Sequence, residues 1–149
     1  MTDYSLVDDE RISALGKLVE VHSHLERVLG RELEASAGLP LTWFEALLRI
    51  ARSPGGELSA GELSHQIALT SGGITRLVDR LVAAGHVERR TSPTDRRSQL
   101  VTLTDGGRET LERACAVHIR GLDQHLFSRL GDRDAADLAR LLDALRHHS

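Results

Sequence analysis

The side chains of this sequence that are best suited to bind a ligand by hydrogen bonds and charge are arginines, and they are concentrated in one segment. Residues 70–98 hold six arginines and three acidic residues, although the whole chain of 149 residues has 19 basic and 22 acidic side chains. A guanidinium group bonds both guanine edges and phosphate oxygens, because its donors lie in a planar fork. An acidic body with one basic face therefore predicts a nucleic-acid partner that docks in a single orientation.

The first arginine-bearing segment, residues 70–84, is predicted to form a helix that fits the major groove of B-DNA. Its apolar residues recur at three- and four-residue steps and define a buried face. The opposite face begins with small and polar residues, and Arg76 is placed to bond O6 and N7 of guanine. An alternative is a solvated face on which the arginines pair with Asp79. The predicted DNA contacts of this helix are Ser71, Gly72, Thr75, Arg76 and Arg80.

The second arginine-bearing segment is predicted to be a β-hairpin. Two β-prone runs, 86–91 and 99–103, flank a turn at residues 92–98 that contains proline and aspartate. We expect Arg97 to enter the minor groove, with Asp95 holding its guanidinium by a charge-assisted hydrogen bond. The other arginines are expected to contact phosphates, and the alternative for the tip is a solvated loop. The predicted DNA contacts of the hairpin are Arg89, Arg90, Asp95, Arg96 and Arg97.

Five further helices are predicted to position these segments. Residues 8–36 form one long amphipathic helix, which a break at residues 38–40 ends, and Thr42 is the expected N-cap of a second helix. After a loop at 53–56, Ser59 and Glu62 form a capping box that starts a short helix.

The remaining boundaries follow from caps. Thr70 is expected to cap the arginine-bearing helix and Gly85 to end it, while Thr104 and Asp132 cap two C-terminal helices. The buried face of the arginine-bearing helix is expected to consist of Ile74, Leu77, Val78, Leu81 and Val82. The prediction is a mainly α chain of six helices with a small β-wing.

Bulk properties place this fold in one domain, residues 1–149. No apolar run approaches the roughly twenty residues that a membrane span needs, and the N-terminus lacks a signal peptide's features, so we expect no membrane association and a cytoplasmic protein. Cys115 is the single cysteine and excludes an internal disulfide. It lies on a predicted apolar stripe, which indicates an inert buried thiol.

The sequence resembles the MarR family of bacterial transcription regulators. The resemblance rests on the wing motif at Asp95–Arg97, the strand exit at 101–104, Gly107 and the helix core at 76–81. It implies a winged helix-turn-helix homodimer that binds a pseudo-palindromic operator in double-stranded DNA. It further implies dimerisation helices at 8–37 and 104–149, a DNA-binding lobe at 40–103, and repression that a small molecule or an oxidant relieves.

The effector site is expected between the dimerisation helices and the DNA-binding lobe, where the family binds ligands. The residues predicted to line it are His22, Trp43, Phe44 and Arg49, and the alternative for the aromatic pair is simple core. Peroxide sensing is disfavoured because the first helix has no cysteine. The three histidines His22, His118 and His125 suggest a zinc site, but hydrogen-bonded or interface histidines are the preferred interpretation, so no metal and no cofactor is predicted.

Two other classes of function compete with regulation. A winged-helix module that binds protein instead of DNA is expected to lack wing arginines, which this chain retains. An enzyme is not predicted, because the sequence has no recognisable nucleophile, glycine-rich phosphate loop or metalloprotease spacing.

Overall fold

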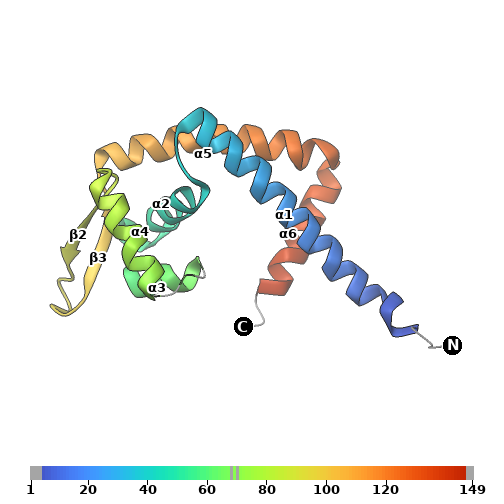
Figure 1. Cartoon of the computed structure of the whole chain (residues 1–149), viewed down its shortest axis with the longest axis horizontal. Coiled ribbons are helices and arrows are strands. Elements are labelled where there is room, and N and C mark those ends of the chain that lie inside the picture. The colour runs from blue at the N-terminus through green and yellow to red at the C-terminus, as the bar shows by residue number, and fades with distance from the viewer. Residues whose placement is uncertain (1–4, 68, 70, 147–149) are drawn as a thin grey trace.

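The computed structural model of the chain describes residues 5–67, 69 and 71–146, with Ser5 and Ser71 described by their backbone only (Figure 1). The six predicted helices and the wing are all present in these residues, which confirms a mainly α fold. The helices are α1 (Glu10–Ala37), α2 (Leu41–Arg52), α3 (Ala60–Gln66), α4 (Ser71–Ala83), α5 (Asp105–His125) and α6 (Asp132–Arg146). The strands are β1 (Glu57–Ser59), β2 (Val87–Thr91) and β3 (Gln99–Leu103), and short 3-10 turns lie at Ser5–Asp8, Pro54–Gly56 and Phe127–Arg129.

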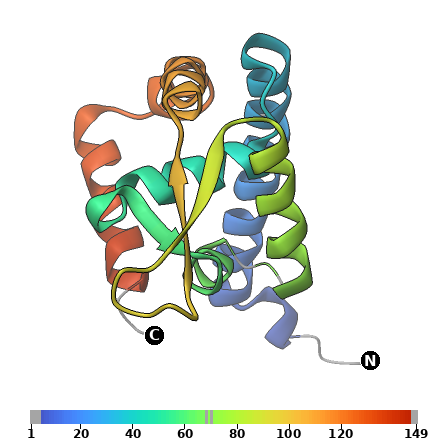
Figure 2. The same cartoon turned by 90° about the vertical axis from the view of Figure 1, so that its left-hand side faces the viewer.

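The elements form a lobe and two extended arms, one made by α1 and the other by α5 with α6. Helices α2, α3 and α4 and the hairpin gather at one end of the molecule, and α5 leads from this lobe along one side (Figure 1). The N-terminal half of α1 projects away from the lobe, and α6 turns down from the far end of α5 (Figure 1), while Figure 2 looks directly onto the hairpin and α4. Each described helix is too short or too polar to cross a lipid bilayer.

Local sequence signals explain most helix ends. The Asp9 side chain caps α1, and Gly38 ends that helix in the left-handed conformation with φ of 64°. The predicted capping box of α3 is present in both directions, between the Ser59 hydroxyl and the Glu62 backbone and between the Glu62 carboxylate and the Ser59 backbone. The Thr104 hydroxyl caps α5 by accepting the backbone N–H of Gly107, as predicted.

Two predicted caps are wrong by one or two residues. Helix α2 begins at Leu41, because the carbonyl of Pro40 accepts the N–H of Phe44, so Thr42 lies inside the first turn. Similarly, Asp132 is the first residue of α6, and the carbonyl of the preceding residue accepts the N–H of Ala135. The predicted cap Thr70 lies outside the described residues.

The sheet adds a strand that the sequence did not predict. Strand β3 lies between β1 and β2 and pairs with both in antiparallel fashion. The register sets Val101 of β3 opposite Leu58 of β1 and Arg89 of β2. Strand β1 has three residues, too few to show an alternating pattern, and it exists because β3 offers its second edge.

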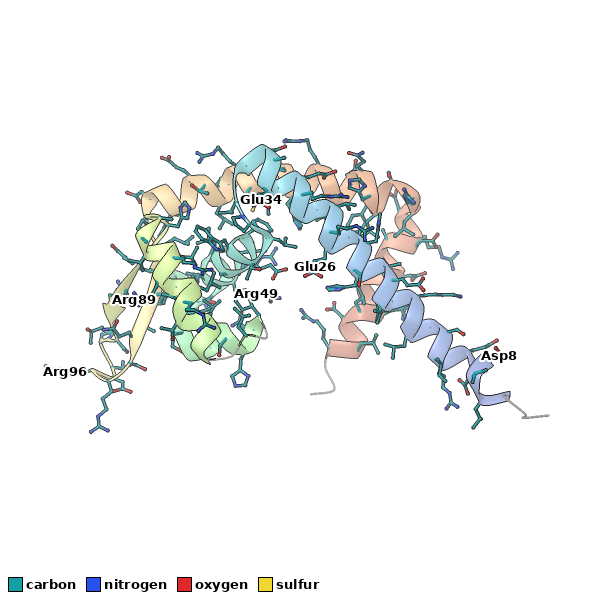
Figure 3. The ribbon with its side chains drawn as sticks, viewed as in Figure 1. Asp8, Glu26, Glu34, Arg49, Arg89 and Arg96 are labelled. Atoms are coloured by element: carbon teal, nitrogen blue, oxygen red, sulfur yellow. The ribbon has the colours of Figure 1, made fainter. Side chains whose placement is uncertain are left out.

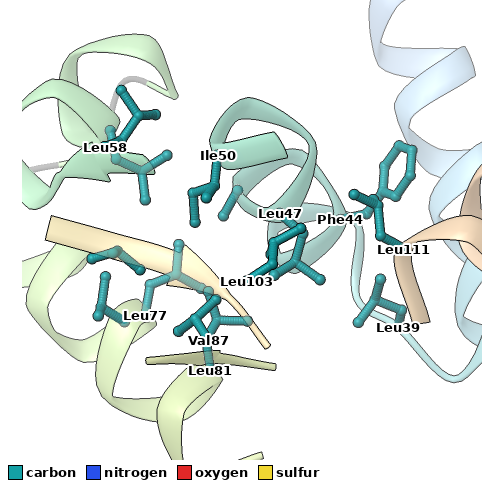
Figure 4. Close-up of a cluster of buried hydrophobic side chains, with 14 of the residues drawn as sticks. Leu39, Phe44, Leu47, Ile50, Leu58, Leu77, Leu81, Val87, Leu103 and Leu111 are labelled. Atoms are coloured by element: carbon teal, nitrogen blue, oxygen red, sulfur yellow. The ribbon is translucent and has the colours of Figure 1, made fainter. Parts of the chain in front are cut away.

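The core of the lobe lies between α2, α3, α4 and the sheet (Figure 4). Four of the five predicted core residues of α4 are buried, but Val82 is 36% exposed, which corrects the prediction for that residue. The buried cluster also includes Leu33 of α1 and Leu111 and Ala114 of α5, so the core joins the lobe to both long helices.

Helices α1 and α5 cross closely beyond the lobe. A Cβ atom at Gly121 would lie 2.6 Å from Oε2 of Glu32 and 2.7 Å from Cδ2 of Leu29, so a larger residue there would require these side-chain ends to shift. Next to this contact, Nε2 of His125 lies 2.5 Å from Oε1 of Glu32. The two helices are therefore held at a defined crossing.

Candidate DNA-binding surface

The exposed face of α4 carries the side chains predicted to meet the major groove. Gly72, Thr75, Arg76 and Arg80 are all exposed, while the side chain of Ser71 is not described. A Cβ atom at Gly72 would lie 3.5 Å from Nη1 of Arg76, so the Arg76 guanidinium lies over the first turn of α4. The guanidinium therefore lies at the end of the helix that would enter a groove.

Burial on the opposite face orients α4. Ile74, Val78 and Leu81 are at most 3% exposed, and Arg76 and Arg80, which lie on the other side of the helix, are exposed. The helix ends in a Schellman motif, in which the N–H of Gly85 bonds the carbonyl of Val82 and the N–H of the next residue bonds the carbonyl of Leu81. Gly85 has φ of 78°, which explains why a glycine stands at the position predicted to end α4.

The tip of the wing is shaped by two short side chains. Ser92 is 8% exposed, and its Oγ accepts the backbone N–H groups of Thr94 and Asp95 at 3.3 Å each. The carboxylate of Asp95 accepts the backbone N–H of Arg97 at 3.0 Å. In this structure Asp95 holds Arg97 through its backbone N–H, and not through the guanidinium as predicted.

The two tip arginines face solvent. Arg96 and Arg97 are both exposed, and Arg96 lies at the outer end of the hairpin (Figure 3). Their freedom from the body of the protein leaves both guanidinium groups accessible to a narrow groove or to phosphates.

The other two wing arginines form ion pairs that the sequence did not reveal. Arg89 of β2 pairs with Asp79 of α4, and Nη2 of Arg90 lies 2.5 Å from Oε2 of Glu57 on β1. The first pair ties the wing to α4, and the second ties the outer strands of the sheet together. Both are partly exposed, so a DNA phosphate would compete with a carboxylate for each guanidinium.

The four residues predicted to line a ligand pocket do not share one cavity. The ring of Phe44 is buried in the core and lies 4.7 Å from the ring of His118, centroid to centroid. The rings of Trp43 and His86 form a T-shaped contact, with centroids 6.0 Å apart. Phe44 is therefore part of the core, and Trp43 packs against the core and against His86, the residue after Gly85. Core packing is the alternative that the sequence left open for this pair.

The two polar members of that set line separate hollows. His22 borders a hollow of about 160 Å³ between α1, α2 and α5, which also contacts His118. Arg49 borders a hollow of about 280 Å³ between α2 and α3. Glu45 lines both, and burial together with the nearby Glu26 raises the pKa of its carboxyl.

The histidines singled out as possible zinc ligands have other partners. His125 bonds Glu32, and Nδ1 of His118 is buried without a hydrogen-bond partner. Burial lowers the pKa of His118, so its neutral form is favoured. In the part of the chain that the structure describes, no three His, Cys, Asp or Glu side chains are grouped to hold a metal ion. Cys115 is half-buried rather than buried as predicted, and burial together with the nearby Glu112 raises the pKa of its thiol, which favours the less reactive protonated form.

Helices α3 and α4 followed by an arginine-tipped hairpin define a winged helix-turn-helix protein, the class in which a helix and a wing contact duplex DNA. A family model described as "MarR family" matches residues 37–98. The multiple antibiotic resistance protein MarR of Escherichia coli is 30% identical over 131 residues, which are 88% of this chain and 90% of that protein. The HTH-type transcriptional repressor Rv2887 of Mycobacterium tuberculosis is 34% identical over 108 residues, which are 72% of this chain and 76% of that protein.

Comparison of structures gives the same result. The crystal structure of Sco3205, a MarR family transcriptional regulator from Streptomyces coelicolor in complex with DNA, matches with a TM-score of 0.81 and 30% identity, and the match covers 92% of this chain and 86% of that chain. The chain belongs to the MarR family of winged helix-turn-helix transcription regulators. The resemblance inferred from the wing motif is thereby confirmed.

Proposed function

We propose that the chain represses transcription by binding a pseudo-palindromic operator as a homodimer. Helix α4 lies in the major groove, where Arg76 contacts a guanine, and residues 92–98 of the wing enter the minor groove through Arg97. The observation that carries the proposal is the exposure of the arginines of α4 and of the wing tip on one lobe, with α4 and β2 tied by the Arg89–Asp79 pair. Rv2887 carries the name of a repressor, and Sco3205 was crystallised with DNA.

A second copy of the chain is the partner that the arms require. Large apolar side chains on α1, α5 and α6 are 41–68% exposed, more apolar surface than a lone soluble protein usually leaves in water. A two-fold axis would place the two α4 helices about 34 Å apart, one turn of DNA. The exposed apolar side chains on α1, α5 and α6 are Ile12, Leu15, Leu18, Val19, Val21, Ile119, Leu141, Leu142 and Leu145.

The division of labour along the chain follows from this assembly. Residues 8–37 and 104–149 supply the dimer contacts, and residues 40–103 supply the DNA-binding lobe. The boundary is not a break in the core, since Leu33 and Leu111 are buried in the lobe itself. Movement of the arms is therefore transmitted to the lobe by direct packing.

A small-molecule effector would act at this boundary. The hollow between α1, α2 and α5 lies between arms and lobe, and His22 and His118 line it. Of the other predicted residues, Arg49 borders the separate hollow between α2 and α3, and Phe44 reaches the first hollow only through its contact with His118. The protein is expected to act in the cytoplasm, where the operator DNA lies, and to have no enzymatic activity.

The decisive experiment measures binding to promoter fragments from the gene's own neighbourhood, over a salt series, with a random fragment as competitor. Arg76→Ala and Arg97→Ala should each weaken binding, and Arg76→Ala alone should relax the preference for one base in the major groove, by about 1–3 kcal/mol. Arg31→Ala is the matched control, because Arg31 is exposed on α1, away from the lobe's arginine surface. Binding by both variants at the level of the wild type would reject the roles assigned to Arg76 and Arg97. Wild-type binding no tighter than to the random fragment would favour a protein-interaction module.

A further inference from the structure

The start of α5 is fastened to the end of α4 through one threonine. Thr104 is the residue between β3 and α5, and its hydroxyl donates to the carbonyl of Gly85 at 2.6 Å. The same oxygen accepts the N–H of Gly107 at 2.9 Å, and the Thr104 N–H donates to the carbonyl of His86 at 3.0 Å. One residue thus links the last turn of the DNA-contacting helix, the base of the wing and the first turn of an arm.

A glycine makes this link tight. A Cβ atom at Gly107 would lie 1.9 Å from the carbonyl oxygen and 2.8 Å from the carbonyl carbon of His86, so backbone packs directly on backbone. At the neighbouring Gly106 a Cβ atom would meet Gly85 at 3.8 Å, which is an ordinary contact. The two adjacent glycines therefore differ sharply in what they allow, although both lie in the first turn of α5.

The segment on the other side of the contact is rigid as well. The N–H groups of Gly85 and His86 are bound in the Schellman motif that ends α4. The His86 ring packs against Trp43 of α2 in a T-shaped contact, and burial and the nearby Arg113 lower the pKa of that histidine. Neither backbone at the contact is free to yield.

We propose that Thr104 and Gly107 form a rigid joint that fixes the direction of α4 relative to α5 and thereby selects the spacing of operator half-sites that the dimer accepts. The inference rests on the proposed function, because it needs a dimer that binds two half-sites. Both residues are positioning residues that touch no DNA.

Half-site spacing is a sensitive measure of this geometry. Each added base pair moves the second half-site by about 3.4 Å and turns it by about 34–36° around the DNA axis. A dimer whose α4 helices are locked to its arms cannot follow such a change without losing contacts at one half-site. With a loosened joint, each α4 turns independently and the penalty for the wrong spacing falls.

The test compares operators whose half-sites are separated by the best spacing, by one base pair more and by one base pair fewer, together with an isolated half-site. Wild type should bind the best spacing most tightly. Thr104→Val should reduce this preference by about 2- to 13-fold for each hydrogen bond lost, and Thr104→Ser should restore it. Affinity for the isolated half-site should change by less than about twofold, because α4 and the wing tip are unaltered.

Gly107→Ala and Gly106→Ala form the matched pair, with folding and dimerisation checked by circular dichroism and by sedimentation. Gly107→Ala should flatten the spacing profile, whereas Gly106→Ala should keep it. A profile that stays as sharp in Gly107→Ala and Thr104→Val as in wild type would overturn the joint, and so would a wild type without any spacing preference. Failure of the wild type to bind any of these operators would instead reject the proposed function.

Discussion

Leu15 offers a direct measure of the proposed dimer. It lies on the N-terminal half of α1, which projects from the lobe, and it is 61% exposed in the single chain. Substituting alanine removes three carbons, worth about 0.8 kcal/mol each when fully buried, or about 1.5 kcal/mol for the exposed share. An interface with two-fold symmetry counts every substitution twice, so the dimer should lose about 3 kcal/mol. That loss raises the dissociation constant of the dimer on the order of 100-fold.

The monomer should fold as before, because the Leu15 side chain has little of its surface against its own chain and alanine favours a helix. Sedimentation velocity over a dilution series measures the dissociation constant, and Lys17→Ala is the control, since Lys17 is exposed on another side of α1. Binding to a full operator should weaken together with dimerisation, whereas binding to a half-site should not. If Leu15→Ala dimerises as tightly as Lys17→Ala, the arm of α1 does not form the interface and the reasoning fails.

Two further predictions concern stability. Ser59→Ala removes the hydroxyl that accepts the N–H of Glu62 at 3.2 Å and should cost about 1 kcal/mol in urea unfolding, while Ser36→Ala, at an exposed site, should cost less than about 0.5 kcal/mol. Burial lowers the pKa of His118 below its ordinary 6.5. As the pH falls from 7 through 6.5, the unfolded chain therefore takes up a proton on this histidine that the folded chain does not yet bind. The free energy of unfolding decreases over this range, until the pH passes the pKa of the folded state. The free energy of unfolding of His118→Gln should depend less steeply on pH between pH 5 and 7.5. His86, whose pKa is also lowered, should account for the pH dependence that remains. An equal slope in wild type and variant would contradict this role of His118.

Charge on the lobe is balanced more closely than a count of arginines suggests. Asp79 and Glu57 each hold a wing arginine, so the free protein presents Arg76, Arg96 and Arg97 to DNA more openly than Arg89 and Arg90. Exposed ion pairs contribute little to stability, and their value here is to hold the wing against α4. Phosphate contacts by the paired arginines remain a prediction for the bound state.

Sequence was sufficient for features that depend on a few neighbouring residues. The capping box at Ser59, the glycine that ends α4 and the cap at Thr104 are local hydrogen-bonding patterns, and the structure has each of them at the predicted residue. The spacing of apolar residues likewise predicted which face of α4 is buried, with Val82 at the margin of that face as the exception. The family could also be inferred, because its wing motif is a short run of adjacent residues.

Only the tertiary structure decided which distant residues meet. Strand β1 forms because β3 pairs with it, and the partners of Arg89 and Arg90 come from elements 10 and 33 residues away. His22, Trp43, Phe44 and Arg49 were grouped by their places in the chain, yet the packing of α1, α2 and α5 sends them to the core and to separate hollows. In the sequence, Gly107 is only one of the residues on which the family resemblance rests, and its close packing against the His86 backbone is visible only in the structure. Such contacts depend on how whole helices pack, which is the sum of many burial terms over the chain and cannot be read from any short segment.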